Sequence, residues 1–226
     1  MHQVAIRKNI IDRVVSRRGK FHLFDHLSPQ HLALVVIDMQ NTFLKPGGAV
    51  EVPMGRNIVS NINKLAENIR SKGGTIIWIA HANQDYGDST DWSNFFDYFV
   101  SEDMKDKTIK GLRAGEEGQD FWHELDILSS DIKLTKNRYS ALISGSSNLE
   151  RYLRSNNLDT LLIAGTKTNV CCDATGRDAM MLDFKTVMVS DCLAALSDEE
   201  HLVTLETFIQ QFGDVMTSDE VLRLLK

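Results

Sequence analysis

Short runs of apolar residues alternate with amphipathic segments along most of the chain. The runs are rich in Val, Ile and Leu and lie at 32–38, 75–80, 160–164 and 186–190, and a shorter one at 132–135. Continuous apolar runs of this length are typical of strands in a parallel sheet whose two faces are both covered. The pattern therefore predicts at least four buried parallel strands.

The segments between these runs have helical spacing. Residues 58–69 place Ile or Leu at every third or fourth position, and shorter stripes follow at 149–158 and 202–212. Ser146 or Ser147 is positioned to cap the 149–158 helix. Strands that alternate with helices predict an α/β fold with right-handed crossovers. In such folds the functional groups gather at the carboxyl ends of the strands.

Two regions depart from this alternation. Residues 1–30 form an N-terminal extension with a helix expected at 6–15, and 31–226 form one domain. Within that domain, 81–122 is long, irregular and rich in aromatic residues. Loops of this length inside a compact domain are usually functional. We expect a cap-like insertion over the strand ends; the alternative is a segment that packs on a neighbouring subunit.

Composition narrows the class of protein. The chain is 42% hydrophobic and 25% charged, with 25 Lys and Arg against 31 Asp and Glu, for a net charge of −6. An acidic balance argues against nucleic-acid or anionic-membrane binding as the main activity. No apolar run approaches the ~20 residues of a membrane span, and the first residues lack the apolar core of a secretory signal. Three cysteines, two of them adjacent, favour a reducing, cytoplasmic location over a disulfide framework.

Three groups that can carry chemistry follow apolar runs. Asp38, Lys136 and Cys171 each come directly after, or a few residues after, a predicted strand. Each has a simpler interpretation when taken alone. The carboxylate could cap a turn, the lysine could be a solvated side chain, and the cysteine could be a small buried hydrophobe.

Together the three groups predict acyl transfer. Cys171 enters a helix that Thr168 or Asn169 could cap, and the positive end of a helix favours a thiolate. A nearby ammonium would lower the thiol pKa further, and a carboxylate could take or return the proton. A nucleophile, a cation and an acid/base are what hydrolysis through a thioester requires.

The sequence around these groups resembles the isochorismatase-like cysteine hydrolases. The resemblance covers about 30–216. It rests on the ordered runs 34–41, 136–140, 165–171 and 187–191, together with Phe43, Thr175, Asp178 and Ala179. It implies a Rossmann-like three-layer sandwich, in which a six-stranded parallel sheet has helices on both faces.

The resemblance also assigns roles at the site. It implies a catalytic triad of Asp38, Lys136 and Cys171, and a cis peptide bond between Thr166 and Lys167. The main-chain N–H groups of Lys167 and Cys171 would form the oxyanion hole. Family members often carry a small residue at position 167, so the lysine is a departure. Its side chain either points away or adds charge near an anionic substrate.

Within the family, the closest resemblance is to ureidoacrylate-type and streptothricin-type amidohydrolases, through 168–171 and 138–140. A nicotinamidase metal site needs an Asp and histidines after the second strand, where this chain offers one histidine, His81, without partners at ligand spacing. His22 and His26 lack a third ligand at defined spacing. We therefore expect neither a metal nor a cofactor.

The predicted activity is hydrolysis of a C–N amide or ureido bond in a small molecule, with release of ammonia or an amine. The alternatives are a vinyl-ether hydrolase of the same fold and a catalytically silent binding module. Family members are commonly dimers or tetramers, so a homodimer or homotetramer is expected. Residues just past strand ends or in the cap are candidates for substrate contact, with plain packing as the alternative for the aromatic ones: Gln40, Asn41, Phe43, His81, Asn83, Trp92 and Tyr139.

Overall fold

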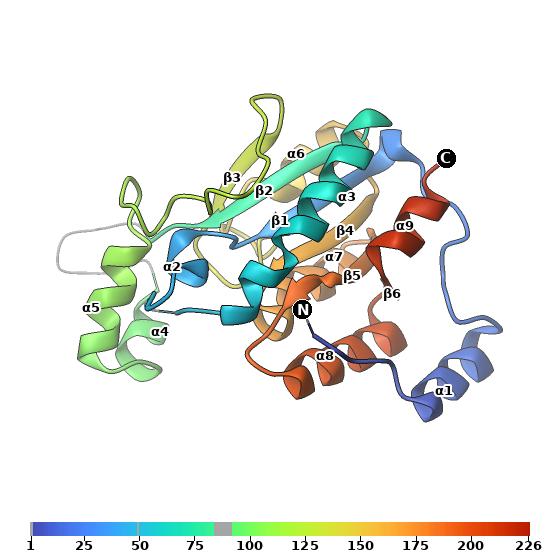
Figure 1. Cartoon of the computed structure of the whole chain (residues 1–226), viewed down its shortest axis with the longest axis horizontal. Coiled ribbons are helices and arrows are strands. Elements are labelled where there is room, and N and C mark those ends of the chain that lie inside the picture. The colour runs from blue at the N-terminus through green and yellow to red at the C-terminus, as the bar shows by residue number, and fades with distance from the viewer. Residues whose placement is uncertain (1, 49, 84–91) are drawn as a thin grey trace.

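One parallel sheet organises the part of the chain that the computed structural model describes, which is residues 2–48, 50–83 and 92–226. Its six strands lie in the order β3-β2-β1-β4-β5-β6, and all neighbours are parallel (Figure 1). The strands are β1 (Leu32–Ile37), β2 (Thr75–His81), β3 (Ile132–Lys136), β4 (Thr160–Thr166), β5 (Lys185–Ala194) and β6 (Asp214–Met216). The predicted α/β fold with a six-stranded parallel sheet is confirmed.

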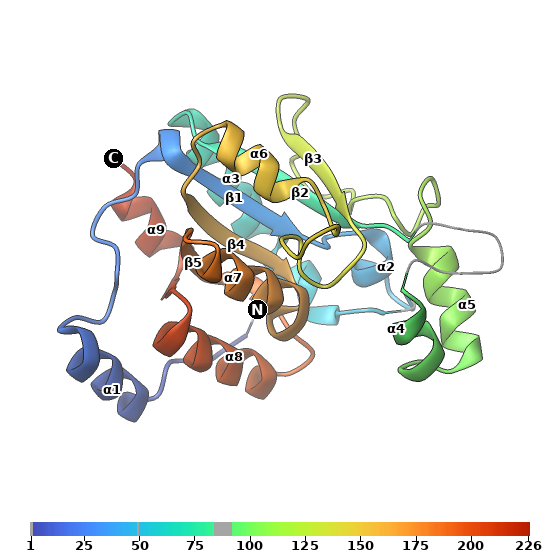
Figure 2. The same cartoon turned by 180° about the vertical axis from the view of Figure 1, so that it is seen from behind.

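Helices cover both faces of the sheet. On one face lie α3 (Val59–Ser71) and α9 (Ser218–Leu224), which Figure 1 shows in front. On the other face lie α6 (Leu149–Ser155), α7 (Asp173–Met181) and α8 (Asp198–Gln211), which Figure 2 shows in front. The central strand β1 is buried along its whole length because its alternate side chains enter these two separate cores. The N-cap of α6 is Asn148 rather than Ser146 or Ser147, although the Ser147 hydroxyl accepts a hydrogen bond from the Leu149 N–H at 3.0 Å.

The N-terminal extension packs against the outside of α8. Its helix α1 runs over Lys8–Arg18, slightly later than expected, and ends at Gly19, whose φ of 79° gives a left-handed cap. Ile10 and Val14 are buried with the residues of α8, and Arg7 forms an ion pair with Glu206. The extension therefore adds a further layer on the α8 side of the sheet (Figure 2).

Short helices gather at the carboxyl end of the sheet. They are α2 (Asn41–Leu44), α4 (Ser93–Tyr98) and α5 (Glu102–Gly111), and they lie beyond the ends of β1 and β2 (Figure 1). The last two belong to the insertion expected at 81–122, of which residues 84–91 lie outside the described residues. Among the helices that the structure describes, none combines the length and apolar character needed to cross a membrane.

Candidate active site

Asp38 is the first residue after β1 and is held in an unusual backbone conformation. Its φ is 53°, its N–H donates to Ile79 O at 2.9 Å, and its carbonyl accepts from the Thr166 hydroxyl at 2.8 Å. The neighbouring β4 approaches so closely here that a Cβ on Gly165 would lie 2.0 Å from Ile37 O. Only glycine fits at this point, so Gly165 allows the ends of β1 and β4 to meet beside Asp38.

Lys136 is the last residue of β3 and points its ammonium toward Asp38. The residue is 1% exposed, and its Nζ lies 2.8 Å from Asp38 Oδ2. The same ammonium donates to His81 Nδ1 and to Arg138 O, both at 3.1 Å. Three acceptors therefore match the three donors of the ammonium, which fixes its position at the carboxyl end of the sheet.

His81 ends β2, between the strands that carry Asp38 and Lys136. Burial and the charge of Lys136 lower its pKa well below the ordinary value, so the imidazole is neutral. Because an ammonium can only donate, Nδ1 is the acceptor and the proton is assigned to Nε2, which lies 3.3 Å from Asn83 Oδ1. His81 is thus a neutral acceptor for Lys136.

Cys171 lies in a π-helical turn, Thr168–Cys172, that follows a cis Thr166–Lys167 peptide bond. The sequence predicted that Cys171 would enter an ordinary helix capped by Thr168 or Asn169. Instead α7 starts at Asp173, and the Thr168 hydroxyl makes a 2.8 Å hydrogen bond with His201 Nδ1 rather than a cap. The Thr175 hydroxyl stabilises this turn by donating a hydrogen bond to Cys171 O at 2.7 Å.

The pKa of the Cys171 thiol differs from the sequence-based expectation. Burial and the neighbouring charge of Asp38 raise the pKa of the Cys171 thiol, and Lys136 only partly opposes them. Burial also raises the pKa of Asp38, against the opposing charge of Lys136 and a hydrogen bond from the Cys171 thiol. Burial acts to lower the pKa of Lys136, but the charges of Asp38 and Cys171 outweigh it and the pKa is raised.

The predicted lowering of the thiol pKa is therefore wrong. In this buried site the negative charge of Asp38 raises the thiol pKa while the positive charge of Lys136 lowers it. The Lys136 ammonium pairs with the Asp38 carboxylate, at 2.8 Å, and not with a Cys171 thiolate. The resting arrangement is an Asp38–Lys136 ion pair beside a protonated thiol. Such an arrangement supplies a base for the thiol proton within the site itself.

A cavity of about 290 Å³ opens above Cys171, which is itself 6% exposed. Most of its lining is aromatic or aliphatic. Four of the predicted contact residues line it, namely Phe43, His81, Trp92 and Tyr139, as do both residues of the predicted oxyanion hole, Lys167 and Cys171. The other lining residues are Val50, Phe95, Phe96, Phe99, Val100, Thr108, Leu112 and Val170.

The remaining predicted contacts, Gln40, Asn41 and Asn83, are not part of this lining. The Gln40 amide clamps the end of β2 by donating to His81 O at 2.9 Å and accepting from His81 N at 2.8 Å. Asn41 donates to Glu117 O at 2.8 Å. Gln40 and Asn41 thus bond main-chain groups, and Asn83 Oδ1 lies 3.3 Å from His81 Nε2, so none of the three amides lines the cavity.

The residues that sequence reasoning missed come mainly from α4 and α5. Thr108 and Leu112 carry no signal in the sequence, because only the docking of α5 brings them to the cavity. The dense aromatic run at 92–99 was the one available signal for this wall. Among the described residues, no group of three or more His, Cys, Asp or Glu side chains is arranged to hold a metal ion.

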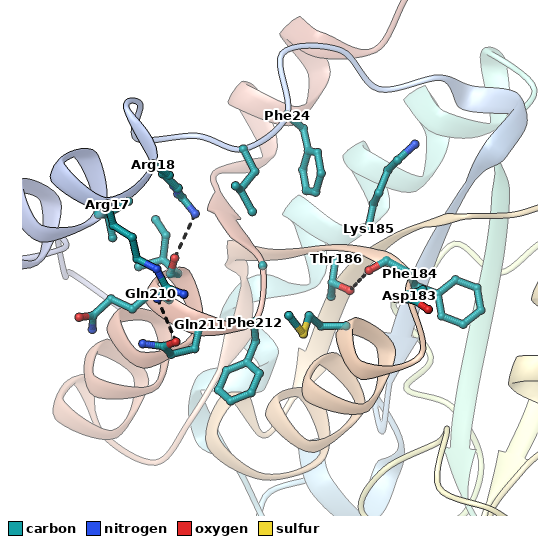
Figure 3. A pocket seen from close by; sticks show the side chains of 15 residues that line it. Arg17, Arg18, Phe24, Asp183, Phe184, Lys185, Thr186, Gln210, Gln211 and Phe212 are labelled. Atoms are coloured by element: carbon teal, nitrogen blue, oxygen red, sulfur yellow. Dashed lines mark hydrogen bonds between the residues drawn. The ribbon is translucent and has the colours of Figure 1, made fainter.

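A larger hollow, of about 440 Å³, lies at the opposite end of the sheet (Figure 3). It is bounded by α1, the ends of α7 and α8, and the start of β5. Two of its polar side chains are engaged with neighbours: Arg17 donates to Gln210 O at 2.9 Å, and the Thr186 hydroxyl donates to Phe184 O at 3.1 Å. None of the three reactive groups lines it.

Comparisons with known proteins address the family to which the chain belongs. The isochorismatase domain model matches residues 32–220. A protein of Arabidopsis thaliana named "probable inactive nicotinamidase" is 31% identical, over 78% of this chain and 87% of its own. The ureidoacrylate amidohydrolase RutB of Klebsiella pneumoniae is 29% identical, over 83% and 85%.

Solved structures extend the comparison to the fold. The crystal structure of a cysteine hydrolase from Pseudomonas syringae pv. phaseolicola superimposes with a TM-score of 0.78 at 28% identity, covering 88% of this chain and 93% of that one. The family model spans most of both cores, the strand ends that carry Asp38 and Lys136, and the turn that carries Cys171. The chain therefore belongs to the isochorismatase family and is a hydrolase of that family.

Proposed function

We propose that the protein hydrolyses a C–N amide or ureido bond of a small molecule through a thioester on Cys171. The observation that carries this proposal is the buried Asp38–Lys136 ion pair, 2.8 Å long, against a thiol at the floor of an apolar cavity. A buried ion pair costs desolvation energy, so its presence beside a nucleophile favours a catalytic role over a structural one.

In the proposed mechanism, Asp38 accepts the thiol proton as Cys171 Sγ attacks the carbonyl carbon. Because the thiol pKa is raised, proton transfer accompanies attack rather than preceding it. Lys136 keeps its proton throughout and holds the Asp38 carboxylate in place. The main-chain N–H groups of Lys167 and Cys171 are proposed to donate to the oxyanion.

The second half of the reaction uses the same groups. Protonated Asp38 gives its proton to the leaving nitrogen as the C–N bond breaks, which releases ammonia or an amine and leaves the thioester. Asp38 then takes a proton from water as the water oxygen attacks the thioester carbonyl. The C–S bond breaks, the thiol regains its proton from Asp38, and the acid product leaves.

The test is ammonia release from a panel of small amides and ureido compounds by the wild type and by Cys171→Ala. Wild-type turnover should fall by at least about 10⁴-fold in Cys171→Ala. Cys172→Ala is the matched control, because Cys172 is fully buried one residue along and does not line the cavity, and it should keep wild-type turnover.

Two other outcomes would identify the alternatives. Hydrolysis that survives Cys171→Ala would contradict the thioester route and favour vinyl-ether chemistry, which needs no thiol nucleophile. Silence of the wild type on the whole panel, together with ligand binding in the cavity, would favour a silent binding module. The inactive status given to the Arabidopsis relative makes that second comparison worth running.

A further inference from the structure

The cavity above Cys171 limits the size of what it can hold. Ligand pockets typically measure ~300–1,000 Å³, so a volume of about 290 Å³ is at the lower limit. A molecule of one ring with short substituents fits such a volume. The reactive carbon must also reach Cys171, which leaves the rest of the molecule against the opposite walls.

Those walls are built largely of aromatic rings that pack on one another. The ring centroids of Trp92 and Tyr139 are 4.7 Å apart, those of Trp92 and Phe95 are 4.9 Å apart, and those of Phe95 and Phe99 are 6.0 Å apart. Rings from α4 and from the loop after β3 therefore meet in one cluster. Aromatic surfaces of this kind favour a planar ring over a flexible aliphatic chain, because offset stacking and edge contacts add to burial.

Lys167 is the exception in this apolar lining. It is the sole residue of the described lining with a permanently charged side chain. None of the ion pairs among the described residues involves it, in contrast to Lys136 and Lys45. Because Lys167 is half-buried in the lining and its side chain is long and flexible, its ammonium can reach an anionic group of a ligand in the cavity and form a charge-assisted hydrogen bond with it.

Thr108, in α5, is a second polar residue of the cavity lining. The residue is 4% exposed, and its hydroxyl oxygen is shielded from solvent with no hydrogen-bond partner among the described residues. A threonine within a helix such as α5 commonly bonds back to the preceding turn, but this one does not. Buried hydroxyls are normally paired, so this hydroxyl would gain a hydrogen bond if its side chain rotated toward a ligand in the cavity.

We propose that the substrate is the primary amide of a one-ring aromatic acid that carries a second, anionic substituent. The aromatic cluster holds the ring, Lys167 pairs with the anion, and the Thr108 hydroxyl bonds to an oxygen of the same molecule. This inference rests on the proposed amide hydrolysis, which it deepens by naming the class of substrate. The lysine at position 167 then acts as a specificity determinant.

The experiment compares kcat/KM for benzamide with that for meta- and para-carboxybenzamide, beside ureidoacrylate and N-carbamoylsarcosine as anions without a ring. One of the carboxybenzamides should exceed benzamide by about tenfold or more and should exceed both non-aromatic anions. In Lys167→Met the ratio of that carboxybenzamide to benzamide should fall by about tenfold, mainly through KM. Thr108→Val should lower the same kcat/KM by a smaller factor.

Lys133→Met is the matched control, because Lys133 is an exposed lysine on β3 that does not line the cavity. It should leave the ratio unchanged. A preference for benzamide, or a ratio that Lys167→Met does not alter, would overturn the inference even if amide hydrolysis is established.

A second measurement, which needs no turnover, distinguishes failure of this inference from failure of the proposed amide hydrolysis. The carboxybenzamides and the neutral benzamide are compared for their ability to protect Cys171 from iodoacetamide at alkaline pH. If no amide is hydrolysed but a carboxybenzamide protects better than benzamide, and Lys167→Met removes the difference, the recognition of an aromatic anion stands without the reaction. Equal protection by the charged and the neutral ring would overturn the recognition as well.

Discussion

The two ends of the sheet carry hollows of opposite character. At the amino ends of the strands, the larger hollow of about 440 Å³ is bounded by groups such as Arg17 and Thr186 that already have hydrogen-bond partners (Figure 3). At the carboxyl ends, the smaller cavity of about 290 Å³ holds a thiol, an adjacent buried ion pair and an unpartnered hydroxyl. Volume alone does not mark the site, because a further hollow of about 590 Å³ between α2 and α5 is lined by none of the three reactive groups. The site is marked instead by the buried ionisable groups beside the thiol.

The difference follows from how parallel strands end. A parallel strand delivers its last side chain to the same edge as its neighbours do, so Asp38, His81 and Lys136 arrive together from three adjacent strands. The amino ends receive chain from helix termini instead, as at Phe184 and Gly213, and those groups mainly complete main-chain hydrogen bonds. Variants at each end of the sheet test this difference.

Apart from loss of the nucleophile itself, the largest expected effect is that of Asp38→Asn. It removes the base while leaving the shape of the side chain, so turnover of whichever amide is found should fall by about a thousandfold. At the same time the thiol pKa should fall, because the carboxylate that raises it is gone and Lys136 remains beside the sulfur. The pH profile of iodoacetamide labelling of Cys171 should therefore move to lower pH. A variant that keeps turnover, or whose labelling profile is unmoved, would contradict the assigned role.

An intermediate effect is expected for His81. His81→Leu leaves one N–H of the buried Lys136 ammonium without an acceptor, at a cost of about 1–3 kcal/mol in the free energy of unfolding, and should lower kcat by about tenfold. His81→Gln keeps an acceptor and should recover part of both losses. The measurements are denaturant unfolding and steady-state kinetics for the pair of variants.

A purely structural role for His81 makes a different prediction. In that case the glutamine and leucine variants would lose stability in proportion to packing, and kcat would not follow the presence of an acceptor. The comparison of the two variants therefore distinguishes a positioning residue from a core residue.

The smallest effect belongs to the amino end of the sheet. Arg17 is exposed and donates to Gln210 O and Gln211 Oε1 at 2.9 and 3.0 Å. Arg17→Ala should change the free energy of unfolding by about 0.5 kcal/mol and leave kcat/KM at the wild-type value. A loss of activity as large as that of His81→Leu would show that the two ends are coupled and would remove the contrast between them.

Much of the fold could be predicted from the local pattern of apolar residues. The apolar runs at 32–38 and 160–164 correspond to β1 and β4 within two residues at each end, because a strand buried on both faces needs a continuous apolar sequence. The stripe at 58–69 corresponds to α3 for the same kind of reason. Asp38, Lys136 and Cys171 were identified because strand ends share one edge of a parallel sheet and because ordered motifs resemble a known family.

Long-range contacts decided the rest. Local position suggested a thiolate at a helix start, yet the thiol pKa is raised because the fold buries it beside Asp38, which is far away in sequence. Gln40 and Asn41 were expected at the cavity, but main-chain partners brought by β2 and by residue 117 occupy them. Thr108 reaches the cavity only through the docking of α5.

The sequence by itself thus determined the alternation of strands and helices and the three reactive groups that follow strands, since these depend on periodicity and on the order of short motifs. The local pattern ended β5 four residues early and did not predict β6. Only the tertiary structure decided which side chains face the cavity, which carry a proton and which are already paired. Those properties depend on burial and on the distance between groups that the chain separates by many residues. Coulomb and desolvation energies respond to that spatial distance and not to position along the chain.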